Sequence, residues 1–174
     1  MVTEYSVPYA AFAALIASAW LVVSPYLPAY AEASAQGDWQ WIRRRAMQAN
    51  AITCALLVFG GGFLVLAGPE IIRRWTSGQV NPETNVLVGL ACFSLLRAVS
   101  NTNGVLLVGL GLVRLAALSY LTVAIVFVFG AWFCLPRYGL VAVPVAGACA
   151  HVLDLAITLP YALRCARVKR VDVN

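Results

Sequence analysis

Five long runs of apolar residues, separated by short segments rich in proline, glycine and arginine, dominate this 174-residue sequence. The runs cover residues 9–26, 46–67, 85–109, 114–135 and 140–162. Each is close to the roughly 20 residues that an α-helix needs to cross the hydrocarbon core of a bilayer. We therefore predict an all-α, polytopic membrane helical bundle of about five transmembrane helices, forming a single transmembrane domain over residues 1–174.

The balance of residue types excludes two broad classes of protein. Hydrophobic residues make up 62% of the chain and charged residues 11%, whereas soluble domains are about half apolar and about a quarter charged. The net charge of +5 lies in clusters beside the apolar runs. Nucleic-acid binding would need a basic stripe on a soluble scaffold, so we expect no nucleic-acid partner.

Proline and glycine set the predicted ends of the runs. Pro25 and Pro28 close the first run, and a small-residue, faintly acidic loop is expected between them and the arginines at 43–45. Gly68 is predicted to end the second helix, before an interfacial turn that begins at 69. Asn81 is predicted to be the N-cap of the third helix and Pro82 its first residue. Pro136 is predicted to stop the fourth helix.

Lysine and arginine placement predicts the orientation in the membrane. Alternating spans put eight of these residues on one side and three, namely Arg73, Arg74 and Arg137, on the other. The positive-inside rule makes the first side cytoplasmic. We expect a multi-pass protein of the cell inner (cytoplasmic) membrane with its N-terminus outside. The eight residues are Arg43, Arg44, Arg45, Arg114, Arg164, Arg167, Lys169 and Arg170.

Three segments carry a resemblance to one family. The segment "PAYAEASAQGDWQWIRRRAMQAN", with its proline, Gly37-Asp38 and arginines, resembles a cytoplasmic loop of polysaccharide flippases in the multidrug/oligosaccharidyl-lipid/polysaccharide exporter superfamily. The segments "LLRAVSNTNGVLLVGLGLVRLAALSY" and "LPRYGLVAVPVAGACAHVLDLAITLPYALR" are similar to its helix–turn–helix and last helix. The resemblance implies the C-terminal portion of a larger transporter, a partial C-terminal lobe of a MATE-like fold whose upstream helices are missing.

The resemblance also implies a function. Such a protein flips a lipid-linked oligosaccharide of the undecaprenyl-diphosphate type across the membrane during polysaccharide (lipopolysaccharide O-antigen) biosynthesis, makes no covalent bond and uses no cofactor. Expected partners are this glycan, membrane lipids, and a polysaccharide polymerase or the missing N-terminal helices. A drug/cation antiporter of the same superfamily and a non-transporting membrane subunit are alternatives. A membrane enzyme would need a carboxylate- or histidine-rich catalytic cluster, which the sequence lacks.

Polar residues inside the third run are the candidate substrate-binding site. Arg97 lies near its middle, where a charge costs at least about 2.5–3.5 kcal/mol. It is predicted either to contact a diphosphate in a water-filled cavity or to pair with Asp154. Ser100, Asn101 and Asn103 follow and are predicted to line the same cavity, with interhelical hydrogen bonds as the alternative.

His151 and Asp154 form a second candidate group. They lie three residues apart, so they share one face of the fifth helix. They are interpreted either as a proton or cation coupling site or as a polar cluster between helices. A single histidine with one aspartate lacks the usual number of metal ligands, and the five cysteines have no metal-binding spacing. We expect no metal site.

Overall fold

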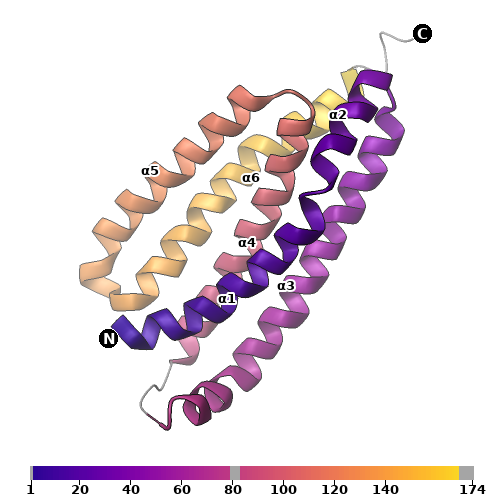
Figure 1. The fold of residues 1–174 in the computed structure, drawn as a ribbon. Helices are drawn as coiled ribbons and strands as arrows, with labels where there is room; N and C mark the ends of the chain where they lie inside the picture. Colours follow the sequence, from indigo (N-terminus) through magenta and orange to yellow (C-terminus); the bar gives the residue numbers. More distant parts are fainter. Residues whose placement is uncertain (1, 79–82, 169–174) are drawn as a thin grey trace.

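The protein is an all-α bundle in the computed structural model, which describes residues 2–78 and 83–168, with side chains over 5–78 and 83–160. The predicted helix start at Asn81 and Pro82 lies outside the described residues. The order along the chain is α1 (Val2–Val23), α2 (Tyr26–Gln36), α3 (Trp39–Trp75), α4 (Thr84–Gly109), α5 (Val113–Tyr138), the 3₁₀ turn η1 (Gly139–Val141) and α6 (Ala142–Val168) (Figure 1).

Four stretches of the described residues are long and apolar enough to cross a membrane, which indicates a multi-pass membrane protein. They are Tyr5–Gln36, Trp39–Trp75, Thr84–Gly109 and Val113–Pro160. The last is 48 residues long and holds α5 and most of α6, which are separate helices. The chain reverses between them at Gly139, whose φ of 61° lies in the region that favours glycine, and α5 and α6 pack side by side (Figure 1).

The predicted loop after the first run is wrong, because residues 26–36 form helix α2. Pro25 is the N-cap of α2, and Pro28 lies in its first turn, where a missing backbone N–H costs no helical hydrogen bond. Gly37 then ends α2 in the left-handed conformation with φ of 75°. Asp38 caps α3 by accepting a hydrogen bond from the Trp41 backbone N–H at 2.9 Å.

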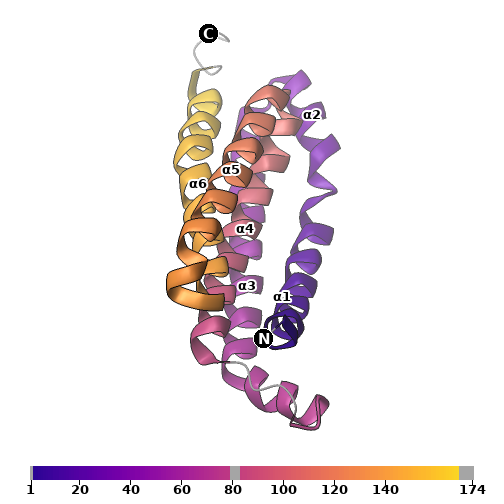
Figure 2. The same cartoon turned by 90° about the vertical axis from the view of Figure 1, so that its left-hand side faces the viewer.

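Two other predicted helix ends are also wrong. Helix α3 continues past Gly68 and contains Pro69, so the predicted interfacial turn is its last part. The 37 residues of α3 would span about 56 Å if straight, well beyond the bilayer core of about 30 Å. Figure 2 shows α3 bending at its C-terminal end. Helix α5 likewise contains Pro136 and ends at Tyr138.

Helix α4 lies at the centre of the bundle and contacts α1, α2, α3, α5 and α6. Its buried residues run along its whole length, whereas the buried residues of α5 are Ala116 and Ser119. Apolar clusters join α4 to α1 through Phe12 and Leu90, and to α2 and α3 through further buried side chains. A polar residue on α4 therefore meets another helix on most sides rather than lipid.

The starts of α3 and α5 lie at one end of the bundle, and the end of α3 and the α5–α6 connection lie at the other (Figure 1). Arg43–Arg45 and Arg114 belong to the first end, and Arg73, Arg74 and Arg137 to the second. At the second end, Glu70 forms ion pairs of 2.7 Å with Arg73 and with Arg74. The membrane orientation drawn from these residues stays a prediction.

Candidate functional site

Arg97 lies on α4 well inside the bundle and is only partly exposed. Its Nη1 donates a hydrogen bond of 3.4 Å to the Tyr9 hydroxyl on α1. Its guanidinium carbon lies 5.8 Å from the centre of the Phe93 ring, one turn earlier on α4, a distance at which a cation is attracted to an aromatic face. These contacts hold the side chain without neutralising its charge.

Arg97 lines a cavity of about 480 Å³ between α1, α4, α5 and α6. This volume lies within the range of ordinary ligand pockets, about 300–1,000 Å³. The apolar part of its wall comes from α4, α5 and α6, with the largest share from α5, and four helices contribute polar groups. These polar lining residues are Tyr5, Tyr9, Arg97, Asn101, Tyr120 and His151.

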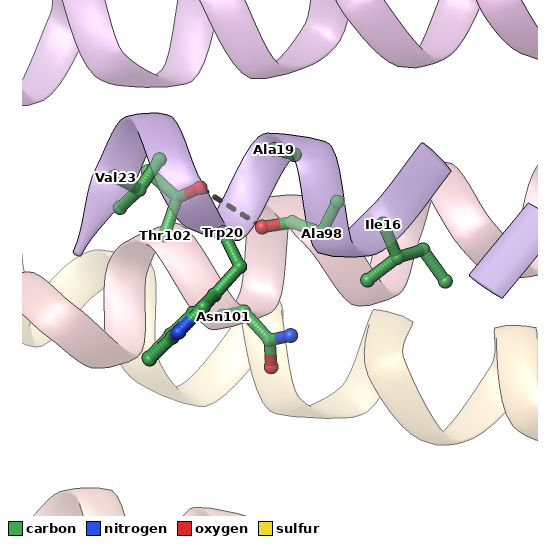
Figure 3. A pocket seen from close by; sticks show the side chains of 7 residues that line it. All are labelled: Ile16, Ala19, Trp20, Val23, Ala98, Asn101 and Thr102. Atoms are coloured by element: carbon green, nitrogen blue, oxygen red, sulfur yellow. Dashed lines mark hydrogen bonds between the residues drawn. The ribbon is translucent and has the colours of Figure 1, made fainter. Parts of the chain in front are cut away.

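Asn101 stands where this cavity meets the contact between α1 and α4. It also borders a recess of about 10 Å³, formed by four residues of α1 and three of α4. In Figure 3 the Asn101 side chain lies beside the Trp20 indole, below the α1 helix. A recess of this size holds about one water molecule. Any larger ligand near Asn101 would therefore occupy the 480 Å³ cavity.

Ser100 does not line the cavity but faces α6. Its hydroxyl donates a hydrogen bond to Asp154 Oδ2, and both residues are buried. The structure shows no Arg97–Asp154 ion pair: Arg97 donates to Tyr9, and Asp154 accepts from Ser100. His151 shares its face of α6 with Asp154, lines the cavity and lies 5.8 Å from the Phe93 ring centre.

Three buried polar atoms near α4 and α6 have no hydrogen-bond partner among the described residues: Ser94 Oγ, His151 Nδ1 and Asp154 Oδ1. Such atoms are uncommon in folded proteins and call for an explanation. Thr158 does not supply one, because its hydroxyl donates to the backbone carbonyl of Asp154. Polarity around Asp154 is thus only partly satisfied inside the bundle.

Asn103 and Thr102 face α3 instead. The side-chain amides of Asn103 and Asn50 exchange hydrogen bonds of 3.4 and 3.5 Å. The hydroxyls of Thr102 and Thr53 lie 3.1 Å apart. These two pairs join α3 to α4 at buried or half-buried positions. For Asn103, the alternative of an interhelical hydrogen bond describes the structure.

Of the four predicted substrate-binding residues, Arg97 and Asn101 therefore line the cavity, whereas Ser100 and Asn103 make contacts between helices. Sequence reasoning missed the tyrosines at 5, 9 and 120. In the structure Gly104 lies against the Tyr120 hydroxyl, so that any larger residue there would overlap it, but no signal in the sequence pairs these two residues. In the described part of the chain, no three His, Cys, Asp or Glu side chains gather as metal ligands.

Comparison with known proteins adds no relative to this description. No protein family model, no curated protein and no solved structure matches the chain.

Proposed function

We propose that this chain belongs to a transporter that flips a lipid-linked oligosaccharide across the cytoplasmic membrane. The observation that carries the proposal is the position of Arg97 on the wall of a 480 Å³ cavity, with no ion pair to Asp154. Placing a guanidinium deep in a membrane bundle costs several kcal/mol unless it has a partner that offsets the cost. An anionic group entering the cavity would supply the partner.

The chemistry of the wall suits a diphosphate bearing a sugar. The planar guanidinium binds two phosphate oxygens at once. The Asn101 amide and the hydroxyls of Tyr9 and Tyr120 offer donors and acceptors for sugar hydroxyl groups. The tyrosine rings add apolar faces on which a sugar can rest. The lipid tail of such a substrate would stay in the bilayer, and no covalent bond would be made or broken.

The full transport unit in this proposal is larger than the chain. We propose that α1, α3, α4, α5 and α6 each cross the membrane once and form part of the C-terminal lobe of a MATE-like transporter. Alternating access needs two halves that move against each other around a central site. The weakly buried α5 and the cavity wall would face the missing half.

Two alternatives make different demands on the site. A drug/cation antiporter would favour a negative cavity. Here the charge on the wall is that of Arg97, and the Asp154 carboxylate is directed to Ser100. A non-transporting membrane subunit would use Arg97 for assembly with another chain. It would not need a phosphate-binding side chain at this position.

The test is complementation of a bacterial strain that lacks its own flippase, with the chain expressed in its natural full-length context. We expect Arg97→Gln to abolish surface glycan and Arg97→Lys to restore part of it, because lysine keeps the charge but loses the fork. Arg114→Gln, a change of the same type at the start of α5, is the control and should support normal glycan.

Expression and membrane insertion must be equal across the variants. Arg97→Gln removes a charge that is costly in the bilayer, so its insertion should not suffer. Normal surface glycan in the Arg97→Gln strain would reject the cavity assignment. If the unaltered protein fails to restore glycan but is needed for another membrane complex, the subunit alternative is correct.

A further inference from the structure

A second cavity, of about 330 Å³, lies between α3, α4 and α6, and the proposed transport function makes no use of it. Most of its wall is one face of α3 from Trp39 to Asn50, with Leu106 of α4 and Leu159 of α6 opposite. It shares no lining residue with the cavity at Arg97. We call it the α3 groove.

The α3 groove is lined mainly by apolar side chains and carries a charge at one end. Arg43 is the one lining residue with a formal charge, and its side chain is exposed. The other polar lining residues are Asn50, two helical turns beyond Arg43 on α3, and Asn103 of α4, which faces it. Their amides bond to each other and to the carbonyls of the preceding turns of their helices. The side-chain amides of Asn50 and Asn103 are therefore already hydrogen-bonded to protein groups.

The surroundings of Arg43 are positive. Residues 38–50 hold three arginines and one acidic residue, Asp38, whose carboxylate caps α3. Arg45 is turned toward its own helix, with hydrogen bonding to Gln48 at 2.9 Å and its guanidinium 5.7 Å from the Trp41 ring. Arg43 is the arginine of this cluster that stands at the groove.

We propose that the α3 groove binds an anionic phospholipid, with its phosphate at Arg43 and one acyl chain along the groove toward Asn50. The positive charge at one end of the α3 groove suits an anionic headgroup, and the apolar remainder of the groove suits a hydrocarbon chain. Basic pockets between transmembrane helices are known to hold such headgroups. Trp39, which lines the same end, is of the residue type that favours the headgroup level of a bilayer.

Fluorescence quenching by brominated lipids tests the headgroup part of the proposal. The full chain is reconstituted with Trp39 as its one remaining tryptophan, and brominated phosphatidylglycerol is compared with brominated phosphatidylcholine. The phenylalanine substitutions are at Trp20, Trp41, Trp75 and Trp132. We expect phosphatidylglycerol to quench at lower mole fractions, and Arg43→Gln to reduce this preference about fivefold.

Arg44→Gln is the matched control, because Arg44 is exposed beside Arg43 but does not line the groove. It should keep most of the preference. An equal loss in the two variants would overturn the proposal and leave only general attraction of the basic cluster to an anionic surface. If the tryptophan replacements disturb folding, native mass spectrometry of phosphatidylglycerol retained by Arg43→Gln and Arg44→Gln in the natural background gives the same comparison.

Filling the groove tests the acyl-chain part. Leu159 lines the groove and is 44% exposed, while Leu153 on the same helix is 47% exposed and lies elsewhere. Leu159→Phe should reduce Trp39 quenching by both lipids at least twofold, and Leu153→Phe should leave it unchanged. Unchanged quenching in Leu159→Phe would show that no chain occupies the groove. None of these readouts depends on glycan transport.

Discussion

Replacing Ser100 by alanine removes the one side-chain hydrogen bond that Asp154 receives among the described residues. The Ser100 hydroxyl and the Asp154 carboxylate are buried, with 1% and 2% of their residue surface exposed, and they join α4 to α6. Since Asp154 Oδ1 already lacks a partner, the variant leaves the whole carboxyl group without a donor. Ser94→Ala is the same change on the same helix, but its hydroxyl makes no hydrogen bond in the described structure.

The expected cost follows from two scales. Hydrogen bonds to charged groups contribute about 1.5–3 kcal/mol in soluble proteins. Hydrogen bonds between membrane helices average about 0.6 kcal/mol, with a maximum of about 1.7, because the unfolded reference state also finds partners. A buried carboxyl group with no other donor belongs at the upper end of the membrane scale. We therefore expect Ser100→Ala to lower the free energy of unfolding by about 1.5 kcal/mol.

Ser94→Ala should change the free energy of unfolding by less than about 0.5 kcal/mol, or raise it, because it removes a buried hydroxyl that has no partner. Reversible unfolding by SDS in mixed micelles, followed by far-ultraviolet circular dichroism, measures both variants. Equal stability of the two would refute the reasoning, since it would mean that the Ser100–Asp154 contact contributes nothing. A Ser100→Ala loss that persists in an Asp154→Leu background would also contradict it.

Two further changes test the packing and the capping of the bundle with the same unfolding measurement. A Cβ at Gly109 would lie 2.6 Å from Tyr30 Cβ, which moves only with the backbone of α2, whereas a Cβ at Gly62 would meet no atom within 4 Å. Gly109→Ala should therefore be about 1–3 kcal/mol less stable than Gly62→Ala. Equal stability of the two variants would contradict this packing. Asp38→Ala should lower the free energy of unfolding by about 1 kcal/mol, because it removes the cap on the Trp41 N–H. Asp38→Asn keeps an acceptor and should cost less than half of that. An equal loss of stability in both variants would show that the charge of Asp38, and not its hydrogen bond, matters.

Hydropathy located the helices well but their ends poorly, and the reason is the position of each proline. Proline breaks a helix where its ring meets the preceding turn, yet in the first turn of a new helix it removes no hydrogen bond. Pro28 is of the second kind and Pro25 is the N-cap before it, so the segment that follows Pro25 is helical. Pro69 and Pro136 lie within helices, because membrane helices tolerate the lost bond when neighbouring groups compensate.

The division of residues 113–160 into two helices could be read from the sequence, because Pro136 and the short segment after it separate two apolar runs. By hydropathy, Val113–Pro160 is one apolar stretch of 48 residues, and the segment Pro136–Gly139 with Arg137 is the break within it. A straight helix of 48 residues would be about 72 Å long, more than twice the bilayer core. The turn at Gly139 and η1 resolves this conflict by folding the stretch into two helices that pack on each other.

The candidate site was only half predictable because the prediction treated consecutive residues as one face. An α-helix turns by about 100° per residue, so consecutive residues do not share one face. Ser100 faces α6, Asn101 the cavity beside α1, and Thr102 and Asn103 face α3. Arg97 and Asn101 lie four residues apart and share a side, which is why these two reach the same cavity. The tyrosines that complete it come from α1 and α5, and no spacing along the chain announces them.

The polar run on α4 is therefore better explained by the central position of the helix than by one binding surface. A helix with neighbours on most sides can use its polar residues for contacts with several of them. Here a serine bonds the carboxylate of α6, and a threonine and an asparagine bond side chains of α3. After these pairings, the α4 side chains that remain at the cavity are Asn101 and Arg97, and the Arg97 guanidinium contacts a tyrosine hydroxyl and an aromatic ring. If Arg97 served only to hold the helices together, we would expect it to form an ion pair with Asp154 on the neighbouring helix α6. The structure instead gives that carboxylate a serine and leaves the arginine to the cavity.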